Sequence, residues 1–288
     1  MRELWIPAVA GMTKGIHPNI YALGAIAMWA SVASLGVALK HVPPFLLTGL
    51  ALVIGSIPAW PLFKQWKVPP RTVALGIYGL FLYHFLLFVA LRTAPAVEAN
   101  LVNYLWPLLI VVLAPVSLPG LALKKAHVFA ALAGFAGAAI AILGGGSASG
   151  TWSWGYLLAA LSAFIWASYS LWTRRVDPFP TAAIGLFGLV SGVLSLLCHL
   201  ALEPRVDLSS RDWLLVTVMG IGPLGAAFFL WDKALKGGDA RHIGILSYLT
   251  PLASTALLVA VTGRAFSPSI LLAAALIIGA AVVGTRAR

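Results

Sequence analysis

The chain has 288 residues, of which 61% are apolar and only 9% are charged, and its formal net charge is +11. So few charged side chains could not cover the surface of a soluble protein, which excludes a water-soluble globular fold and predicts that most of the chain faces lipid. Long apolar runs recur along the chain, each sufficient to cross about 30 Å of hydrocarbon as a helix. These runs are continuous rather than alternating, which excludes an outer-membrane β-barrel.

Taken in chain order, ten apolar stretches are predicted to be membrane-spanning helices. The expected spans are residues 18–39, 45–63, 73–92, 97–115, 127–145, 153–173, 182–201, 212–231, 242–262 and 267–285. The sequence therefore predicts an all-α integral membrane protein with ten transmembrane helices. The single cysteine, Cys198, excludes an internal disulfide.

The basic residues indicate the orientation of these helices. With the N-terminus inside, the inner segments contain fourteen lysine and arginine residues and the outer ends contain five. Such an excess is typical of cytoplasmic loops, so both termini are predicted to lie in the cytoplasm. Topology thus accounts for the positive charge, and nucleic acid is not an expected partner.

Several phrases of the sequence occur twice. The stretch "NLVNYLWPLLIV" at residues 100–111 matches "GILSYLTPLAST" at residues 244–255 with an offset of 144, and Trp29 in "AMWASVASL" matches Trp166 in "FIWASYSLW". The glycine-rich "GGGSASG" at residues 144–150 separates the two halves. We expect a cytoplasmic segment at residues 1–17 and two repeats at residues 18–147 and 148–288. Because each repeat has an odd number of spans, the two copies must be inverted, an arrangement typical of transporters.

This arrangement resembles the drug/metabolite transporter superfamily. The "W-A-S" sequences at residues 29–31 and 166–168 and the "P-L" pairs at residues 107–108 and 251–252 are similar to those of tandem EamA-type domains. The resemblance covers nearly the whole chain and implies a ten-helix exporter. The aromatic residues, among them Tyr78, Tyr104, Trp106 and Trp166, are most similar to those of bacterial aromatic amino-acid exporters. That likeness implies export of amino acids across a bacterial inner membrane, with aromatic and other large apolar side chains favoured.

Two prolines interrupt the fourth and ninth spans. Proline lacks an N–H group, so Pro107 is expected to free the carbonyl of Asn103, and Pro251 that of Ser247. Unpaired carbonyls are tolerated at membrane depth only where protein or a water-filled cavity satisfies them. The sequence therefore favours a substrate cavity beside these breaks, with helix kinking and polar packing as the alternative.

Aromatic and polar residues near mid-span are the candidates for this cavity. Aromatic walls would hold an apolar body, while amide groups and freed carbonyls would receive an ammonium group. The candidate substrate-binding residues are Trp29, Tyr78, His84, Asn100, Asn103, Tyr104, Trp106, Trp166, Tyr169, Ser247 and Tyr248. Lipid contact is the alternative role for the tryptophans, and an interhelical hydrogen bond is the alternative for His84. Tyr78 and His84 lie about 120° apart on one helix, so they are not expected to face the same substrate together.

Charged residues supply further candidates. The acidic residues are all expected at span ends or in loops, so the usual proton-coupling carboxylate has no candidate, and transport down a concentration gradient is favoured. His84 and Glu98 are the weaker candidates for proton coupling. Lys40 is a candidate contact for a substrate carboxylate. Asp232 is a candidate for a cytoplasmic gate, with surface pairing as the alternative.

Other classes of protein are less compatible with the sequence. Enzyme motifs such as HExxH and a phosphate-binding glycine loop are absent, so no catalytic residue, metal or cofactor is expected. A channel or receptor-like membrane protein is the alternative class, and other small metabolites or cationic drugs are the alternative substrates. Small-residue seams in the fifth and tenth spans predict helix packing, with a monomer favoured over a dimer. The expected partners are an amino-acid substrate and membrane lipid.

Overall fold

The computed structural model describes residues 16–118, 120–143, 152–262 and 268–286, and all regular elements in these ranges are helical. The elements of the first half are α2 (Pro18–Ala30), α3 (Val32–Ala38), α4 (Pro44–Ser56), η1 (Ile57–Trp66), α5 (Pro70–Ile77), η2 (Tyr78–Leu82), α6 (Tyr83–Thr93), α7 (Ala96–Asn103), α8 (Trp106–Ser117) and α9 (Lys125–Leu143). Those of the second half are α10 (Gly155–Trp172), α11 (Ala183–Leu202), α12 (Ser210–Ile221), η3 (Gly222–Ala226), α13 (Ala227–Gly237), α14 (Ala240–Leu246), α15 (Leu249–Thr262) and α16 (Pro268–Arg286). The all-helical prediction is confirmed.

Consecutive elements join into long apolar segments. By length and composition, eight segments of the described residues can cross a membrane, and they run from Pro18–Ala38 through Ser210–Gly237. They correspond to the first eight predicted spans. The ninth predicted span falls on α14 and α15, which are separated by a break, and the tenth falls on α16, which is apolar but shorter over Pro268–Gly284. The predicted separator at residues 144–150 lies outside the described residues, as does most of the predicted N-terminal segment.

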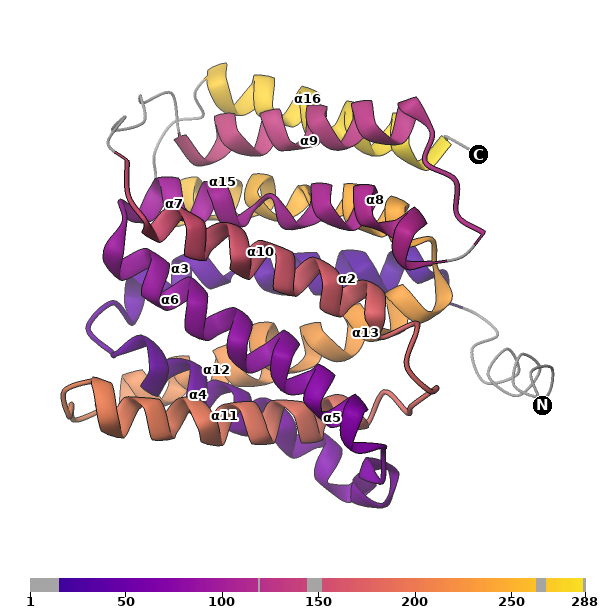
Figure 1. Ribbon diagram of the computed structural model, residues 1–288. Helices are drawn as coiled ribbons and strands as arrows, with labels where there is room; N and C mark the ends of the chain where they lie inside the picture. The colour runs from indigo at the N-terminus through magenta and orange to yellow at the C-terminus, as the bar shows by residue number, and fades with distance from the viewer. Residues whose placement is uncertain (1–15, 119, 144–151, 263–267, 287–288) are drawn as a thin grey trace.

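The helices lie roughly parallel to one axis of the bundle (Figure 1). α2 begins and α16 ends on the same side of the bundle, on the right in Figure 1, which we call the terminal side; the opposite side is the far side. α2 runs from the terminal side to the far side, whereas α10 runs from the far side to the terminal side. The first helices of the two halves therefore point in opposite directions.

Equivalent helices of the two halves pack against one another. α4 lies along α11, and α9 lies along α16. α10 packs against α6 and α8 of the first half, just as α2 packs against α13 and α15 of the second. The repeat in the sequence is thus also a repeat in the packing, and it brings the middle of α2, α8, α10 and α13 together at the core.

Two irregular segments occupy matching positions in the halves. The π-helical segments η2 and η3 begin at Tyr78 and Gly222, and 222 − 78 = 144 is the offset of the repeated phrase. The fourth predicted span is interrupted between Asn103 and Trp106, immediately before Pro107, and the ninth is interrupted between Leu246 and Leu249. Because π-helical turns and helix breaks leave backbone groups without their usual partners, such segments often lie at functional sites.

Gly55 allows α4 to approach η3 and the end of α12 closely. A Cβ atom there would lie 2.6 Å from the carbonyl oxygen of Gly220 and 2.7 Å from Cα of Gly225, and neither backbone atom can rotate away. We expect Gly55→Ala to lower the free energy of unfolding by about 1–3 kcal/mol, although alanine is the better helix former.

The matched control for this prediction is Gly279→Ala on α16. A Cβ atom at Gly279 meets nothing within 4 Å among the described residues, so this change should leave the thermal unfolding temperature unchanged or slightly higher. Both temperatures can be measured on purified protein in detergent. Equal unfolding temperatures for the two variants would contradict the close approach at Gly55.

Candidate functional site

A cavity of about 370 Å³ lies between the two halves of the chain. It occupies the far-side part of the bundle, since its lining residues include Gly36 at the end of the first segment, Thr48 at the start of the second and Leu91 at the end of the third. Its aromatic lining residues are Trp29, Tyr83, Phe88, Tyr104, Trp106, Trp166 and Phe228. Its other polar lining residues are His84, Asn100, Asn103, Thr48 and Thr250. Among the described residues that line it there is no aspartate, glutamate, lysine or arginine.

Four tryptophans form a cluster at the terminal-side end of the cavity. The ring centroid of Trp29 lies 5.9 Å from that of Trp166, 6.4 Å from that of Trp106 and 5.2 Å from that of Trp231. Trp231 is fully buried behind the other three, and its Nε1 donates a hydrogen bond of 3.1 Å to the hydroxyl of Ser170. Edge-to-face contacts of this kind make a rigid apolar wall that leaves ring faces and edges available to a ligand.

Asn103 is a polar residue of the cavity wall whose hydrogen bonds reach both halves. Its side chain is buried at the end of α7, where its Nδ2 donates a hydrogen bond of 3.2 Å to the hydroxyl of Tyr83. Its Oδ1 accepts a hydrogen bond of 2.9 Å from the hydroxyl of Ser162 on α10. The amide orientation is therefore held from both sides, and the amide connects the two halves at the cavity edge.

The irregular segments contribute contacts to the site. The Nε1 atom of Trp29 donates a hydrogen bond of 3.0 Å to the carbonyl oxygen of Pro223 in η3, a carbonyl at the interrupted part of the helix. Across the cavity, Nδ1 of His84 lies 2.5 Å from the carbonyl oxygen of Leu80 in η2. Since a carbonyl can only accept, Nδ1 carries a proton in this arrangement. Each π-helical segment thus orients one ring of the cavity.

The repeat brings equivalent residues into edge-to-face contact at the cavity. Trp29 and Trp166 match in the sequence and contact each other. His84 and Phe228 are separated by the repeat offset, since 84 + 144 = 228, and their ring centroids lie 6.3 Å apart. Applying the offset to His84 would have identified Phe228, which the sequence analysis missed. Tyr83 and Trp231 were also missed, and no repeated motif identifies them.

Seven of the predicted substrate-binding residues meet at the cavity, and the other four lie elsewhere. The seven are Trp29, His84, Asn100, Asn103, Tyr104, Trp106 and Trp166. Tyr169 packs behind Trp166 with a centroid distance of 5.4 Å. Tyr78 lies in a different pocket, with its hydroxyl 2.8 Å from that of Ser168. The predicted angular separation of Tyr78 and His84 agrees with their placement in different pockets.

The ninth predicted span does not present its candidates to the cavity. Ser247 is fully buried, and its hydroxyl donates a hydrogen bond of 2.6 Å to the carbonyl of Gly244. The carbonyl of Ser247 accepts a hydrogen bond of 3.0 Å from the N–H of Thr250, so it is not left unpaired as expected from Pro251. Tyr248 is fully buried against α9, where its ring occupies the space beside Gly134. Thr250 is the residue of this region that lines the cavity.

The three charged candidates also lie away from the cavity. Lys40 is exposed just beyond α3, and Glu98 is partly exposed in the first turn of α7. Asp232 is only 3% exposed, and its Oδ2 accepts hydrogen bonds of 2.7 Å from Lys236 and 2.6 Å from Thr181. The Asp232 carboxylate is therefore buried, although its partner Lys236 has a side chain that is 27% exposed.

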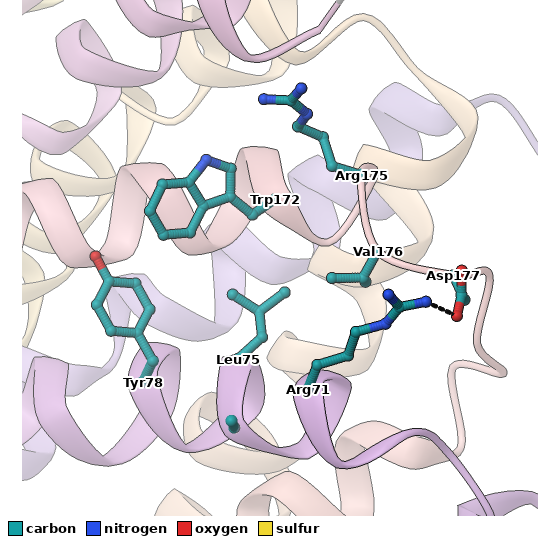
Figure 2. Close-up of a pocket in the computed structure, with 8 residues that line it drawn as sticks. Arg71, Leu75, Tyr78, Trp172, Arg175, Val176 and Asp177 are labelled. Atoms are coloured by element: carbon teal, nitrogen blue, oxygen red, sulfur yellow. Dashed lines mark hydrogen bonds and ion pairs between the residues drawn. The ribbon is translucent and has the colours of Figure 1, made fainter.

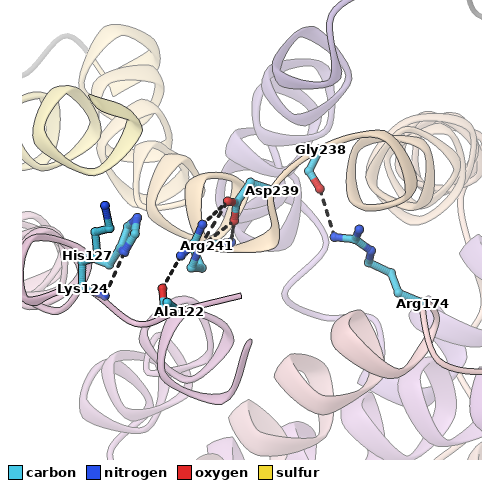
Figure 3. A network of polar contacts seen from close by, with 7 residues as sticks. All are labelled: Ala122, Lys124, His127, Arg174, Gly238, Asp239 and Arg241. Atoms are coloured by element: carbon cyan, nitrogen blue, oxygen red, sulfur yellow. Dashed lines mark hydrogen bonds and ion pairs between the residues drawn. The ribbon is translucent and has the colours of Figure 1, made fainter. Parts of the chain in front are cut away.

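Polar contacts connect separate segments on the terminal side (Figure 3). Arg241 pairs with Asp239 at 2.5 Å and donates a hydrogen bond to the carbonyl of Ala122, between α8 and α9. Arg174, just beyond α10, donates a hydrogen bond of 3.1 Å to the carbonyl of Gly238. Burial raises the pKa of Asp239, but the hydrogen bonds from Arg241 outweigh it and hold that pKa below its ordinary value. The carboxylate is therefore ionised at neutral pH, and the contact is intact there.

A helical bundle with repeated halves around a cavity of this kind defines a membrane transporter. The model of the EamA-like transporter family matches residues 18–143 and 153–285, and the chain belongs to this family. The predicted family and the two-repeat architecture are thereby confirmed, and membership implies a small-molecule substrate.

Individual relatives and a solved structure are similar to this chain over most of its length. The chain is 42% identical over 275 residues to the aromatic amino acid exporter YddG of Ancylobacter novellus, covering 91% of this chain and 94% of the relative. It is 27% identical over 274 residues to the aromatic amino acid exporter YddG of Salmonella typhimurium, covering 88% and 83% of the two chains. A solved crystal structure with 41% sequence identity superimposes with a TM-score of 0.87, over 93% of this chain and 97% of that chain. Such bacterial relatives imply a multi-pass protein of the inner membrane.

Proposed function

We propose that this protein exports amino acids, with aromatic and other large apolar side chains favoured, by alternating access. The observation that carries the proposal is the uncharged, aromatic-walled cavity between the two halves. Its volume of about 370 Å³ lies in the range of small-molecule sites. A zwitterionic amino acid has no net charge, so it suits a cavity whose lining residues carry no fixed charge. The names of the relatives support the same substrate class.

The helix break between α7 and α8 supplies partial charges for a zwitterion. α7 ends at Asn103 and α8 begins at Trp106, and both residues line the cavity. The carbonyl end of one helix favours a positive group and the N–H end of the next favours a negative group. We therefore assign the substrate ammonium to the Asn103 end and the carboxylate to the start of α8, and Lys40 is not needed for the carboxylate.

The proposed topology is ten spans in two inverted halves, at residues 18–147 and 148–288, with both termini in the cytoplasm. Basic residues of the described chain gather on the terminal side: Lys64, Lys67, Arg71, Lys124, Lys125, Arg174, Arg175, Lys233, Lys236, Arg241 and Arg286. The far side has Lys40, Arg92, Arg205 and Arg211. This excess supports a cytoplasmic terminal side.

The proposed mechanism exchanges the conformations of the halves. In the described state the cavity lies toward the far side, while Arg241 and Arg174 join segments on the terminal side. Inverted repeats can adopt each other's conformation, which would close the far side and open the terminal side. A substrate entering from the cytoplasm would then leave on the far side.

The test is uptake of labelled phenylalanine into proteoliposomes, with and without unlabelled phenylalanine inside. A carrier should show faster uptake when internal substrate is present. Trp166→Ala should raise the KM for phenylalanine about tenfold, because an aromatic contact and its buried area are lost, and should affect alanine uptake less. Trp154→Ala is the matched control, since Trp154 is 53% exposed outside the cavity, and it should leave the KM unchanged.

Three results would contradict parts of the proposal. Uptake that internal substrate does not accelerate would favour a channel. Equal effects of the Trp166 and Trp154 variants on the KM would show that the cavity does not lie on the transport path. No uptake with any amino acid, for folded protein, would overturn the substrate class and direct the search to other small metabolites and cationic drugs.

A further inference from the structure

A second pocket lies on the terminal side, separate from the central cavity (Figure 2). Its volume is about 430 Å³, and it lies between α5, the end of α10 and the segment that follows α10. It shares no lining residue with the central cavity. α5 begins and α10 ends on the terminal side, so the pocket lies where membrane-spanning segments meet the interface. A polar headgroup, rather than a lipid tail, belongs at this depth.

Two arginines give the pocket its charge. Arg175 is exposed, and in Figure 2 its side chain extends from the segment after α10 on the Trp172 side of the pocket. Arg71 pairs with Asp177, but both side chains of this pair are more than half exposed, so the pair is weak and solvent-screened. One Arg71 nitrogen contacts Asp177, while a guanidinium group has five N–H donors. With one acid and two arginines, the pocket has an excess positive charge of one.

An aromatic pair forms the opposite part of the pocket. The rings of Tyr78 and Trp172 stack with centroids 5.8 Å apart and an interplanar angle of 22°. Trp172 is 37% exposed, which is typical of tryptophan at the level of lipid headgroups. Leu75 and Val176 add apolar surface between the rings and Arg71. Arg71 at one end, amphipathic rings at the other and Arg175 as a second cationic lining residue match a phosphate joined to a glycerol and acyl chains.

We propose that this pocket binds the headgroup phosphate of an anionic phospholipid from the leaflet on the terminal side. Arg71 and Arg175 donate to the phosphate oxygens, and the glycerol lies against Trp172 and Tyr78. Basic pockets between membrane-spanning helices are recognised sites for anionic headgroups. Because Arg71 belongs to α5 of the first half and Arg175 follows α10 of the second, one lipid bridges both halves. The proposal does not depend on the identity of the transported substrate.

Native mass spectrometry and thermal unfolding of the purified full-length protein in neutral detergent test the proposal. Phosphatidylglycerol should remain bound as one molecule per chain and raise the unfolding temperature, whereas phosphatidylcholine should do neither. Arg175→Gln should weaken phosphatidylglycerol binding about fivefold, and Arg71→Gln with Arg175→Gln about 25-fold, from the contribution of each basic residue near anionic lipid. Because Arg175 is exposed, its single variant keeps the test valid even if the double variant folds poorly.

The matched control is Lys124→Gln with Lys125→Gln, which removes the same charge from the same side of the bundle. This variant should bind phosphatidylglycerol as the unchanged protein does. Equal weakening in both double variants would show diffuse attraction and overturn the site. Equal retention of phosphatidylcholine would overturn the role of the anionic charge. Stabilisation by inorganic phosphate alone, to the same extent as by phosphatidylglycerol, would assign the pocket to a free anion instead of a lipid.

Discussion

Asn103→Ala is expected to reduce amino-acid transport by roughly one to two orders of magnitude without preventing folding. The side-chain amide of Asn103 donates a hydrogen bond to the hydroxyl of Tyr83, accepts one from the hydroxyl of Ser162 and lines the cavity. Removing it leaves the hydroxyl of Tyr83 without this partner, whereas the fully buried hydroxyl of Ser162 keeps its hydrogen bond to the carbonyl of Ala159, so the stability cost should be no more than about 1–3 kcal/mol. The change also removes the amide beside the proposed ammonium position. Initial rates of labelled phenylalanine uptake into proteoliposomes measure the loss.

Ser247→Ala is the control for this prediction, because Ser247 is the equivalent of Asn103 in the second repeat. Asn103 and Ser247 are equivalent at the offset of 144, but Ser247 is fully buried outside the cavity and bonds only within its own helix turn. Its replacement should therefore leave uptake within about twofold of the unchanged protein, since neutral hydrogen bonds contribute only about 1 kcal/mol. If both variants lost transport equally, the asymmetry between the two halves at the site would be wrong.

Lys236→Met is expected to be the most destabilising of the changes considered, by about 3–5 kcal/mol in the free energy of unfolding. The change leaves the carboxylate of Asp232, whose side chain is only 2% exposed, without its counter-ion. Thr181 alone then donates to the carboxylate. Lys236 also donates to the carbonyl of Phe179 and lies 3.9 Å from the centroid of its ring, and those contacts are lost as well. Thermal unfolding in detergent measures the effect.

The double variant Asp232→Asn with Lys236→Met separates charge from packing. Removing both charges together should restore most of the lost stability, because a buried ion pair can be replaced by uncharged groups of similar volume at little cost. Arg71→Met is the comparison variant, because it removes an ion pair at the surface. Its pair with Asp177 is more than half exposed on both side chains, so a loss of no more than about 1 kcal/mol is expected. A double variant as unstable as Lys236→Met alone would show that lost packing, rather than the unpaired charge, causes the effect.

Membrane class, the first eight spans and the repeat could be predicted because they depend only on hydropathy and on the order of residues. Apolar length decides which segments can cross a bilayer, and it needs no knowledge of neighbouring helices. The offset of 144 was equally accessible, and it recurs in η2 and η3, the two π-helical segments. The family resemblance was confirmed by matches over residues 18–143 and 153–285.

Residues of the candidate site could be predicted from the sequence where both the residue type and a position near the middle of a span indicated a cavity. Trp29, Trp106 and Trp166 are too far from the span ends for an interfacial role, and all three line the cavity. Sequence spacing was insufficient for Tyr248, which matches Tyr104 in the repeat but is turned against α9 beside Gly134. Two equivalent residues thus have different surroundings, so the repeat offset alone does not decide which side chains line the cavity.

By itself, the sequence determined that this protein is an all-helical membrane transporter with two repeats, because hydropathy and repeated motifs are properties of the chain alone. Only the tertiary structure decided that Asp232 is buried, that Tyr78 lies outside the central cavity and that Phe228 lines it. The direction of a side chain depends on the rotation of its helix, and that rotation is set by the π-helical turns and by packing against helices distant in sequence.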